Sequence, residues 1–411
     1  MTNTSDFSID RADLADLIRR RRLPDAVYVT RPTMPDLRQY TEVLEGIWDR
    51  KWLTNQGPLH ETLEAKLSAY LGVEHLSLFC NGTIAILVAL EALRINSGEV
   101  ITTPFSFPAT THSLYWNRVR PVFCDIDPVT LNLDPTKIER LISPETRAIL
   151  AVHVYGRPCN VEAIERIANV HGLQVIYDAA HAFGVRYKGR SILNYGDMSI
   201  LSFHATKLFT TVEGGALVCA SDVRRQRVNS LKNFGIADEE TVIGPGINGK
   251  MNELQAAFGL MQLESVDLEI SNRRVLSHLY RELLAAIPGV TFLSDIPDTE
   301  STYAYLAVLI DEAHFGMSRD DLFALLRKCN IVARKYFYPL ISSAPCYSAL
   351  PSAASSNLPV AERVAKQVLC LPIYGTLDAQ TVRAVCETIS EAQVVCSAGK
   401  AQAALMGVRT T

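Results

Sequence analysis

Four residues of the chain have the types and positions to do chemistry together. Gly82 and Thr83 follow a short β-rich run and begin a helical pattern, so their N–H groups and hydroxyl could bind a phosphate, although an ordinary helix N-cap is the commoner explanation. Asp178 ends an apolar run, where a carboxylate either caps a helix or holds a cation in a pocket. Lys207 follows another apolar run; such a lysine is usually on the surface, unless a lowered pKa makes it a nucleophile.

The combination of these groups is more specific than any one of them. A phosphate-binding turn, an acid and a lysine are what pyridoxal 5′-phosphate (PLP) needs: an anchor for its phosphate, a counter-ion that keeps its ring nitrogen protonated, and an amine for its aldehyde. The protonated ring is an electron sink, and a free Lys207 can move a proton at the substrate α-carbon. We therefore predict a PLP enzyme in which Lys207 and Asp178 are the catalytic residues.

A mostly parallel sheet is predicted to bring these residues together. Short β-rich runs alternate with helical patterns such as TIAILVALEAL and NVEAIERIANVHG, which is typical of a doubly wound α/β sheet. Ligands of such sheets bind beyond the carboxyl ends of the strands, where the candidate residues lie. The β-rich runs cover residues 76–80, 99–103, 121–125, 148–154, 174–178, 198–203 and 215–220.

The sequence is predicted to divide into four parts. Residues 1–30 are mostly polar and charged and would form an N-terminal extension, and residues 31–250 would form the large PLP-binding domain. Helical patterns at 251–286 link this domain to residues 287–411. Strand, helix and strand patterns follow there, so a small α+β C-terminal domain is expected.

The composition excludes several classes of partner. The formal net charge is −4, so no positive field gathers nucleic acid or an anionic membrane, and the basic run Arg19–Arg22 stands among aspartates as a solvated face. No run approaches the roughly 20 apolar residues of a membrane span, and the first residues have neither the basic start nor the apolar stretch of a signal peptide. The nine cysteines are scattered without metal-ligand spacing. We expect no metal, reduced thiols and a cytoplasmic location.

Five stretches of the sequence resemble one known family. They are NGTIAILVAL, TTPFSFPAT, VIYDAAHAFG, LSFHATKLFTTVEGG and GINGKMNELQAAFGL. Together they are similar to the sugar aminotransferases of the DegT/DnrJ/EryC/StrS group, over nearly everything from about residue 30 to residue 390. The resemblance implies PLP fold type I, with a mostly parallel seven-stranded sheet in the large domain and a small α+β C-terminal domain.

The resemblance also implies how the cofactor ring is held. Lys207 would form a Schiff base with PLP, and Asp178 would contact the pyridine nitrogen. Phe107 would stack on one face of the ring, and Ala180 would lie against the other. His181 stands where many members have Gln, near the phenolic oxygen of the cofactor. It either keeps that hydrogen bond, which is the favoured interpretation, or is merely a packed imidazole.

Four further residues are implied to contact a phosphate group. Gly82, Thr83 and Ser202 would hold the phosphate of their own subunit, and Asn248 would reach that of the neighbouring subunit. The resemblance therefore implies an obligate homodimer with two shared active sites. The loop around Asn248 reads GINGKM where the family often has GYNYRM, with Lys250 in place of arginine, so its substrate contacts stay open.

The reaction implied is the transamination of a nucleotide-linked sugar. One branch of the family has histidine in place of the lysine and is a dehydratase, whereas Lys207 is present here. SFHATK and VEGG resemble members that aminate position 4, converting a nucleotide-linked 4-keto-6-deoxysugar into the 4-amino-4,6-dideoxysugar with L-glutamate as donor. The segment 334–339 resembles the stretch that borders the sugar site, and an aromatic strand edge explains it equally well.

Several alternatives share some of these features. Amination at the 3-keto position, or of another keto sugar or a cyclitol, would use the same cofactor residues, as would a dehydratase. A non-catalytic binding protein with the PLP fold would not need both Lys207 and Asp178. A nicotinamide dehydrogenase is disfavoured because no GxGxxG follows the first strand.

Overall fold

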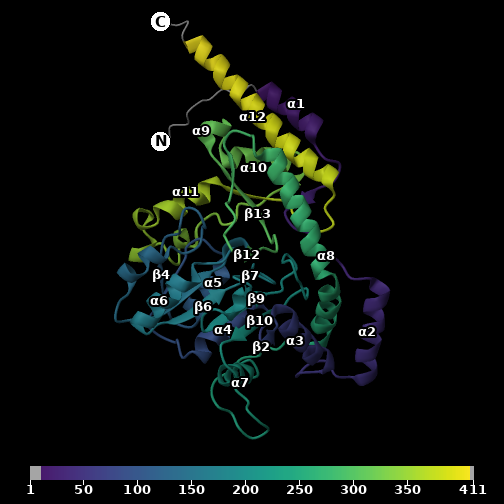
Figure 1. The fold of residues 1–411 in the computed structure, drawn as a ribbon, viewed down its shortest axis with the longest axis vertical. Helices are drawn as coiled ribbons and strands as arrows, with labels where there is room; N and C mark the ends of the chain where they lie inside the picture. The colour runs from purple at the N-terminus through teal and green to yellow at the C-terminus, as the bar shows by residue number, and fades with distance from the viewer. Residues whose placement is uncertain (1–10, 408–411) are drawn as a thin grey trace.

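A seven-stranded sheet forms the centre of the larger part of the molecule (Figure 1). The computed structural model describes residues 11–407, with side chains from 13 to 397. The strand order is β2-β10-β9-β6-β5-β3-β4; only β10 is antiparallel to its neighbours, so the predicted mostly parallel sheet is confirmed. The strands are β2 (Leu76–Phe79), β3 (Glu99–Thr102), β4 (Arg120–Phe123), β5 (Thr146–Val152), β6 (Gln174–Asp178), β9 (Met198–Ser202) and β10 (Gly215–Cys219).

Helices cover both faces of this sheet because its strands are apolar on both sides. In β5, Ile149 and Ala151 pack into a core with α3, α6 and part of α8. Ala148 and Leu150 of the same strand point to the other face, where α4, α5 and α7 cover them. The helices are α3 (Pro58–Leu71), α4 (Gly82–Ala92), α5 (Pro108–Trp116), α6 (Val161–His171), α7 (Asp222–Leu231) and α8 (Glu253–Leu284).

The second part of the molecule is built on a three-stranded antiparallel sheet in the order β11-β13-β15. The long helix α8 runs along both parts (Figure 1). A small sheet, β12-β7-β8, pairs a strand that follows α8 with the connection between β6 and β9. The elements are β7 (Arg186–Tyr187), β8 (Arg190–Ser191), β11 (Val290–Phe292), β12 (Thr299–Glu300), β13 (Leu306–Ile310), α9 (Glu312–Phe315), α10 (Arg319–Lys328), β14 (Ile331–Val332), α11 (Pro359–Gln367), β15 (Val368–Leu371) and α12 (Ala379–Gly407).

The start of the described chain packs against its end. Helix α1 (Arg11–Arg21) lies along α12, and β1 (Val27–Tyr28) pairs in parallel with β14, ahead of α2 (Leu37–Arg50) (Figure 1). Arg20 and Arg21 form ion pairs with Glu391 of α12 at 2.5 and 2.6 Å. The basic run is therefore only partly a solvated face, since two of its residues face carboxylates.

None of the helices within residues 11–407 is long and apolar enough to cross a membrane.

Candidate active site

One cavity of about 690 Å³ collects the sequence-predicted residues at the carboxyl ends of β2, β6 and β9. Eight of the nine candidates line it, although they come from separate segments of the chain. The position agrees with the rule that open α/β sheets bind ligands at this edge. The eight residues are Gly82, Thr83, Phe107, Asp178, Ala180, His181, Ser202 and Lys207.

The first turn of α4 forms one wall of the cavity. Asn81 caps the helix by accepting a hydrogen bond from the N–H of Ile84 at 2.9 Å, and Gly82 is the first helical residue. A Cβ atom at Gly82 would lie 3.2 Å from Cβ of Ser202, and one at Gly215 would lie 2.7 Å from the nitrogen of Gly82. Glycines therefore let two strands approach a helix N-terminus, whose N–H groups and positive dipole favour an anion such as a phosphate.

Asp178 is a buried carboxylate that ends β6. Its Oδ2 accepts a hydrogen bond from Oγ1 of Thr110 at 2.7 Å, and its Oδ1 accepts one from the N–H of Ala180 at 3.1 Å. Ser106 Oγ lies 2.8 Å from the Thr110 hydroxyl. No helix begins between β6 and β7 in the described chain, so the alternative of a helix cap is wrong. The carboxylate is instead presented to the cavity.

Lys207 enters the same cavity from the turn after β9. Burial lowers the pKa of its ammonium to about 8, and the negative charge of Asp178 opposes part of that change. Its ammonium makes no hydrogen bond or ion pair with any side chain that the structure describes. An amine in this state is partly deprotonated near neutral pH and suits attack on an aldehyde. The residues present therefore fit PLP: a free amine, a buried carboxylate and an anion-binding turn.

His181 is held as a neutral imidazole. Its Nδ1 accepts a hydrogen bond from the N–H of Tyr155 at 3.2 Å, so the proton of the neutral ring lies on Nε2. Burial, helped by the charge of Lys207, places the pKa of His181 well below its usual value. Its ring stacks on Phe337 at 5.8 Å and lies 4.7 Å from the ring of Tyr305. His181 thus offers one Nε2–H donor from a packed position.

The other two ring-contact candidates differ in exposure. Phe107 precedes α5 and is 59% exposed although it lines the cavity, so its ring has few contacts within one chain. Ala180 lies in the turn after Asp178, also at the cavity wall.

Asn248 is the candidate that the single chain does not bring to the cavity. It is exposed and pairs through its backbone with Asn233, which follows α7.

Sequence reasoning missed two residues that shape the site, Thr110 and Tyr305. Thr110 stands in TTPFSFPAT, but its partner Asp178 is far away in the sequence, so local spacing gave no signal.

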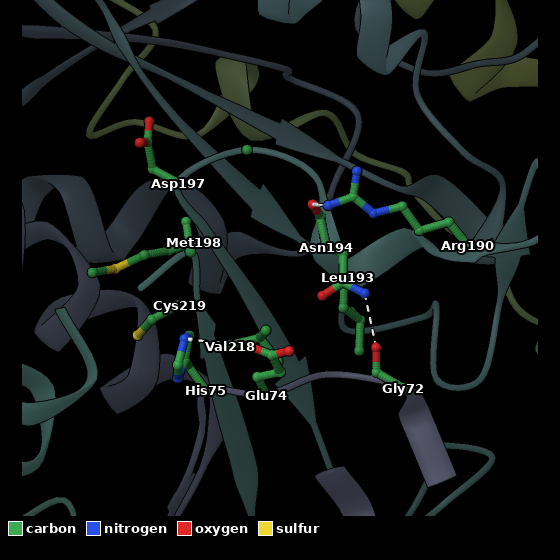
Figure 2. Close-up of a pocket in the computed structure, with 12 residues that line it drawn as sticks. Gly72, Glu74, His75, Arg190, Leu193, Asn194, Asp197, Met198, Val218 and Cys219 are labelled. Carbon is green, nitrogen blue, oxygen red and sulfur yellow. Dashed lines mark hydrogen bonds and ion pairs between the residues drawn. The ribbon is translucent and has the colours of Figure 1, made fainter. Parts of the chain in front are cut away.

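A second cavity, of about 340 Å³, is lined by residues at the amino ends of β2 and β9, among them His75 and Met198 (Figure 2). It contains none of the predicted residues. Its polar groups are used within the chain: Asn194 donates to the backbone oxygen of Gly72 at 2.8 Å, and Arg190 donates to that of Asn194 at 2.6 Å. Because it lies at the amino ends of β2 and β9, we do not take it as the active site.

Known proteins match most of the chain. The model of the DegT/DnrJ/EryC1/StrS aminotransferase family matches residues 37–390. The dTDP-4-amino-4,6-dideoxy-D-glucose transaminase of Escherichia coli is 52% identical over 86% of this chain and 95% of its own length, and that of Shigella dysenteriae is 47% identical over 89% and 98%. The crystal structure of DesI in the presence of its TDP-sugar product has a TM-score of 0.88 at 34% identity, covering 96% of this chain and 99% of DesI.

Proposed function

Because the chain belongs to the DegT/DnrJ/EryC1/StrS aminotransferase family and is a PLP-dependent transaminase of fold type I, we propose a specific reaction for it. It transfers the amino group of L-glutamate to the keto group of a dTDP-linked 4-keto-6-deoxysugar, which gives the 4-amino-4,6-dideoxysugar and 2-oxoglutarate. The observation that carries this proposal is the identity of 52% and 47% to two transaminases named for that product.

We assign the two catalytic roles to Lys207 and Asp178. When bound, PLP supplies a protonated ring that accepts electrons from the substrate α-carbon. Asp178 keeps the ring nitrogen protonated, and Thr110 fixes the carboxylate for this task by donating to Oδ2 at 2.7 Å. Lys207 would hold the cofactor aldehyde and, as a free amine once the substrate has displaced it, would move the proton at the α-carbon, which its lowered pKa of about 8 supports near neutral pH.

The remaining cofactor contacts follow from the wall of the cavity. Gly82, Thr83 and Ser202 bind the phosphate at the N-terminus of α4. Phe107 and Ala180 both line the cavity and would lie against the two faces of the ring. His181 would donate a hydrogen bond from Nε2–H to the phenolic oxygen of the ring. This nitrogen carries the proton because Nδ1 accepts from the N–H of Tyr155.

We further propose that the protein is a homodimer in which Asn248 reaches the phosphate in the partner's site. Trp48, Trp52, Phe107 and Phe234 are all exposed aromatic residues in the single chain. Aromatic residues are enriched at the buried centre of protein interfaces, and a second copy of the chain would cover them.

We also propose the division into an N-terminal extension (1–30), a large domain (31–250), linking helices (251–286) and a small domain (287–411). The two sheets have separate hydrophobic cores, which supports this division. A cytoplasmic location is supported by buried thiols such as Cys124 and Cys159, which a reducing compartment preserves.

The test follows the two substrates separately. Purified protein with PLP is mixed with L-glutamate alone, and the visible spectrum of the cofactor is recorded. We expect loss of the visible band and one equivalent of 2-oxoglutarate. Addition of dTDP-4-keto-6-deoxy-D-glucose is expected to restore the band and to give a product whose new amine NMR places at C4. An amine at C3, or a spectrum that ignores glutamate, would refute the proposal.

A further inference from the structure

Arg334 is a cation with a rigid backbone at the wall of the active-site cavity. Its N–H donates to the backbone oxygen of Cys370 at 3.0 Å, and its own oxygen accepts from the N–H of Cys370 at 2.7 Å. Cys370 lies in the middle of β15 and is fully buried. The base of the Arg334 side chain is therefore fixed by a strand-like pair, which reduces the entropy lost when the side chain binds a ligand.

The charge of Arg334 has no counter-ion within the described part of the chain, where its guanidinium makes no hydrogen bond or ion pair. The next residue is different, because Lys335 pairs with Asp320 at 3.0 Å. Burial raises the pKa of Tyr336, and the charge of Arg334 opposes that rise. Since Tyr336 also lines the cavity, the positive field of Arg334 acts inside it.

The other charged groups of the cavity already have tasks. Lys207 and Asp178 hold the cofactor under the proposed function, and Glu213 faces His204 at 3.7 Å. The proposed phosphate contacts come from neutral groups and a helix N-terminus. Among the described residues that line the cavity, Arg334 supplies the one guanidinium.

We propose that Arg334 is the anion-binding residue of the substrate chamber in both halves of the reaction. This inference rests on the proposed function, in which two substrates enter one cavity in turn. L-Glutamate brings carboxylates and the nucleotide sugar brings a diphosphate, and a guanidinium binds either group with two parallel hydrogen bonds. A cation left free in the resting protein can serve one substrate after the other.

The experiment compares Arg334→Leu with a matched control, Arg327→Leu. Arg327 is an exposed arginine of α10 that does not line the cavity. Each PLP-loaded variant is mixed with rising concentrations of L-glutamate, and the half-saturation concentration and limiting rate are taken from the loss of the visible band. In a second arm, dTDP competes against glutamate, and its inhibition constant is measured. Gel filtration and circular dichroism establish that each variant is folded.

Loss of a hydrogen-bonded charge contact is expected to raise the half-saturation or inhibition constant about 10- to 100-fold. Arg334→Lys, which keeps the charge without the fork, should recover part of this loss, and Arg327→Leu should match the wild type. A rise in both arms supports the shared role, whereas a rise in one arm alone overturns it. Unchanged constants in both arms overturn the inference. If the wild type itself ignores glutamate, the proposed function fails instead.

Discussion

The substitution Asp178→Asn should speed the capture of PLP by Lys207 and slow turnover. Burial lowers the pKa of Lys207 to about 8, and the negative charge of Asp178 raises it against that trend. An amide carries no charge, so the pKa of Lys207 falls further in the variant. More of the amine is then free at neutral pH, and capture of PLP by Lys207 becomes faster. Turnover nevertheless falls, because asparagine cannot keep the ring nitrogen protonated.

The size of the gain in capture rate is bounded by the structure. At pH 7.5, a lysine with its ordinary pKa of 10.5 would be only about 0.1% free amine, whereas a pKa of about 8 leaves about a quarter of Lys207 free. The variant can at most make all of the amine free. Asp178→Asn should therefore accelerate capture at pH 7.5 by no more than about fourfold, and by more at lower pH.

The assay measures how fast the visible band grows when PLP is added to cofactor-free protein between pH 6 and pH 10. We expect a midpoint near the pKa of about 8 in the wild type and a lower midpoint in Asp178→Asn. Asp295→Asn is the control, since its carboxylate is 89% exposed and does not line the cavity. A wild-type midpoint near the ordinary lysine value, or an upward shift in Asp178→Asn, would show that burial and the carboxylate do not set the reactivity of Lys207.

Two further predictions concern stability. Thr110→Val removes the hydrogen bond to the Asp178 carboxylate and should lower the free energy of unfolding in urea by about 1.5–3 kcal/mol. Thr111→Val is the control and should leave this free energy unchanged, because that buried hydroxyl has no partner in the described chain. Equal losses in the two variants would contradict this reasoning. Burial raises the pKa of Glu391, but its bonds to arginines such as Arg21 outweigh this and leave the pKa lowered. A carboxylate whose pKa is lowered in the folded state stabilises the fold above its unfolded pKa, and this stabilisation is lost as the pH falls through the folded-state pKa. Glu391→Gln should therefore reduce the melting temperature more at pH 7 than at pH 3.

The sheet and the proposed catalytic pair, Asp178 and Lys207, could be located from the sequence because both depend on local pattern. β6 is an uninterrupted apolar run that ends in a carboxylate, and β9 is followed directly by the turn that carries Lys207. A buried strand needs apolar residues on both faces, so its end is visible as a change of residue type. Parallel strands then align their carboxyl ends, which brings Asp178 and Lys207 to one cavity.

Contacts between distant segments were not accessible in this way. Thr110 of α5 bonds to Asp178 across the sheet edge, and an ordinary helical threonine gives no sign of such a partner. The ion pairs between the basic run of α1 and Glu391 of α12 could not be predicted for the same reason, because the two helices lie at opposite ends of the sequence. Charge patterns on one segment show that a cation needs a partner and do not show which one it finds.

His181 shows how far one residue's role depends on such contacts. Its position near Asp178 could be read from the sequence, which favoured a hydrogen-bond donor but left a packed imidazole as the alternative. The structure makes these alternatives complementary: Tyr155 donates its backbone N–H to Nδ1 from a left-handed conformation with φ of 57°, and Phe337 stacks on the ring. Tyr155 also donates its hydroxyl to the backbone oxygen of Tyr336. Packing from the segment next to Arg334 thus leaves Nε2–H as the donor. The same residues therefore border the substrate chamber and hold His181 for its proposed cofactor contact.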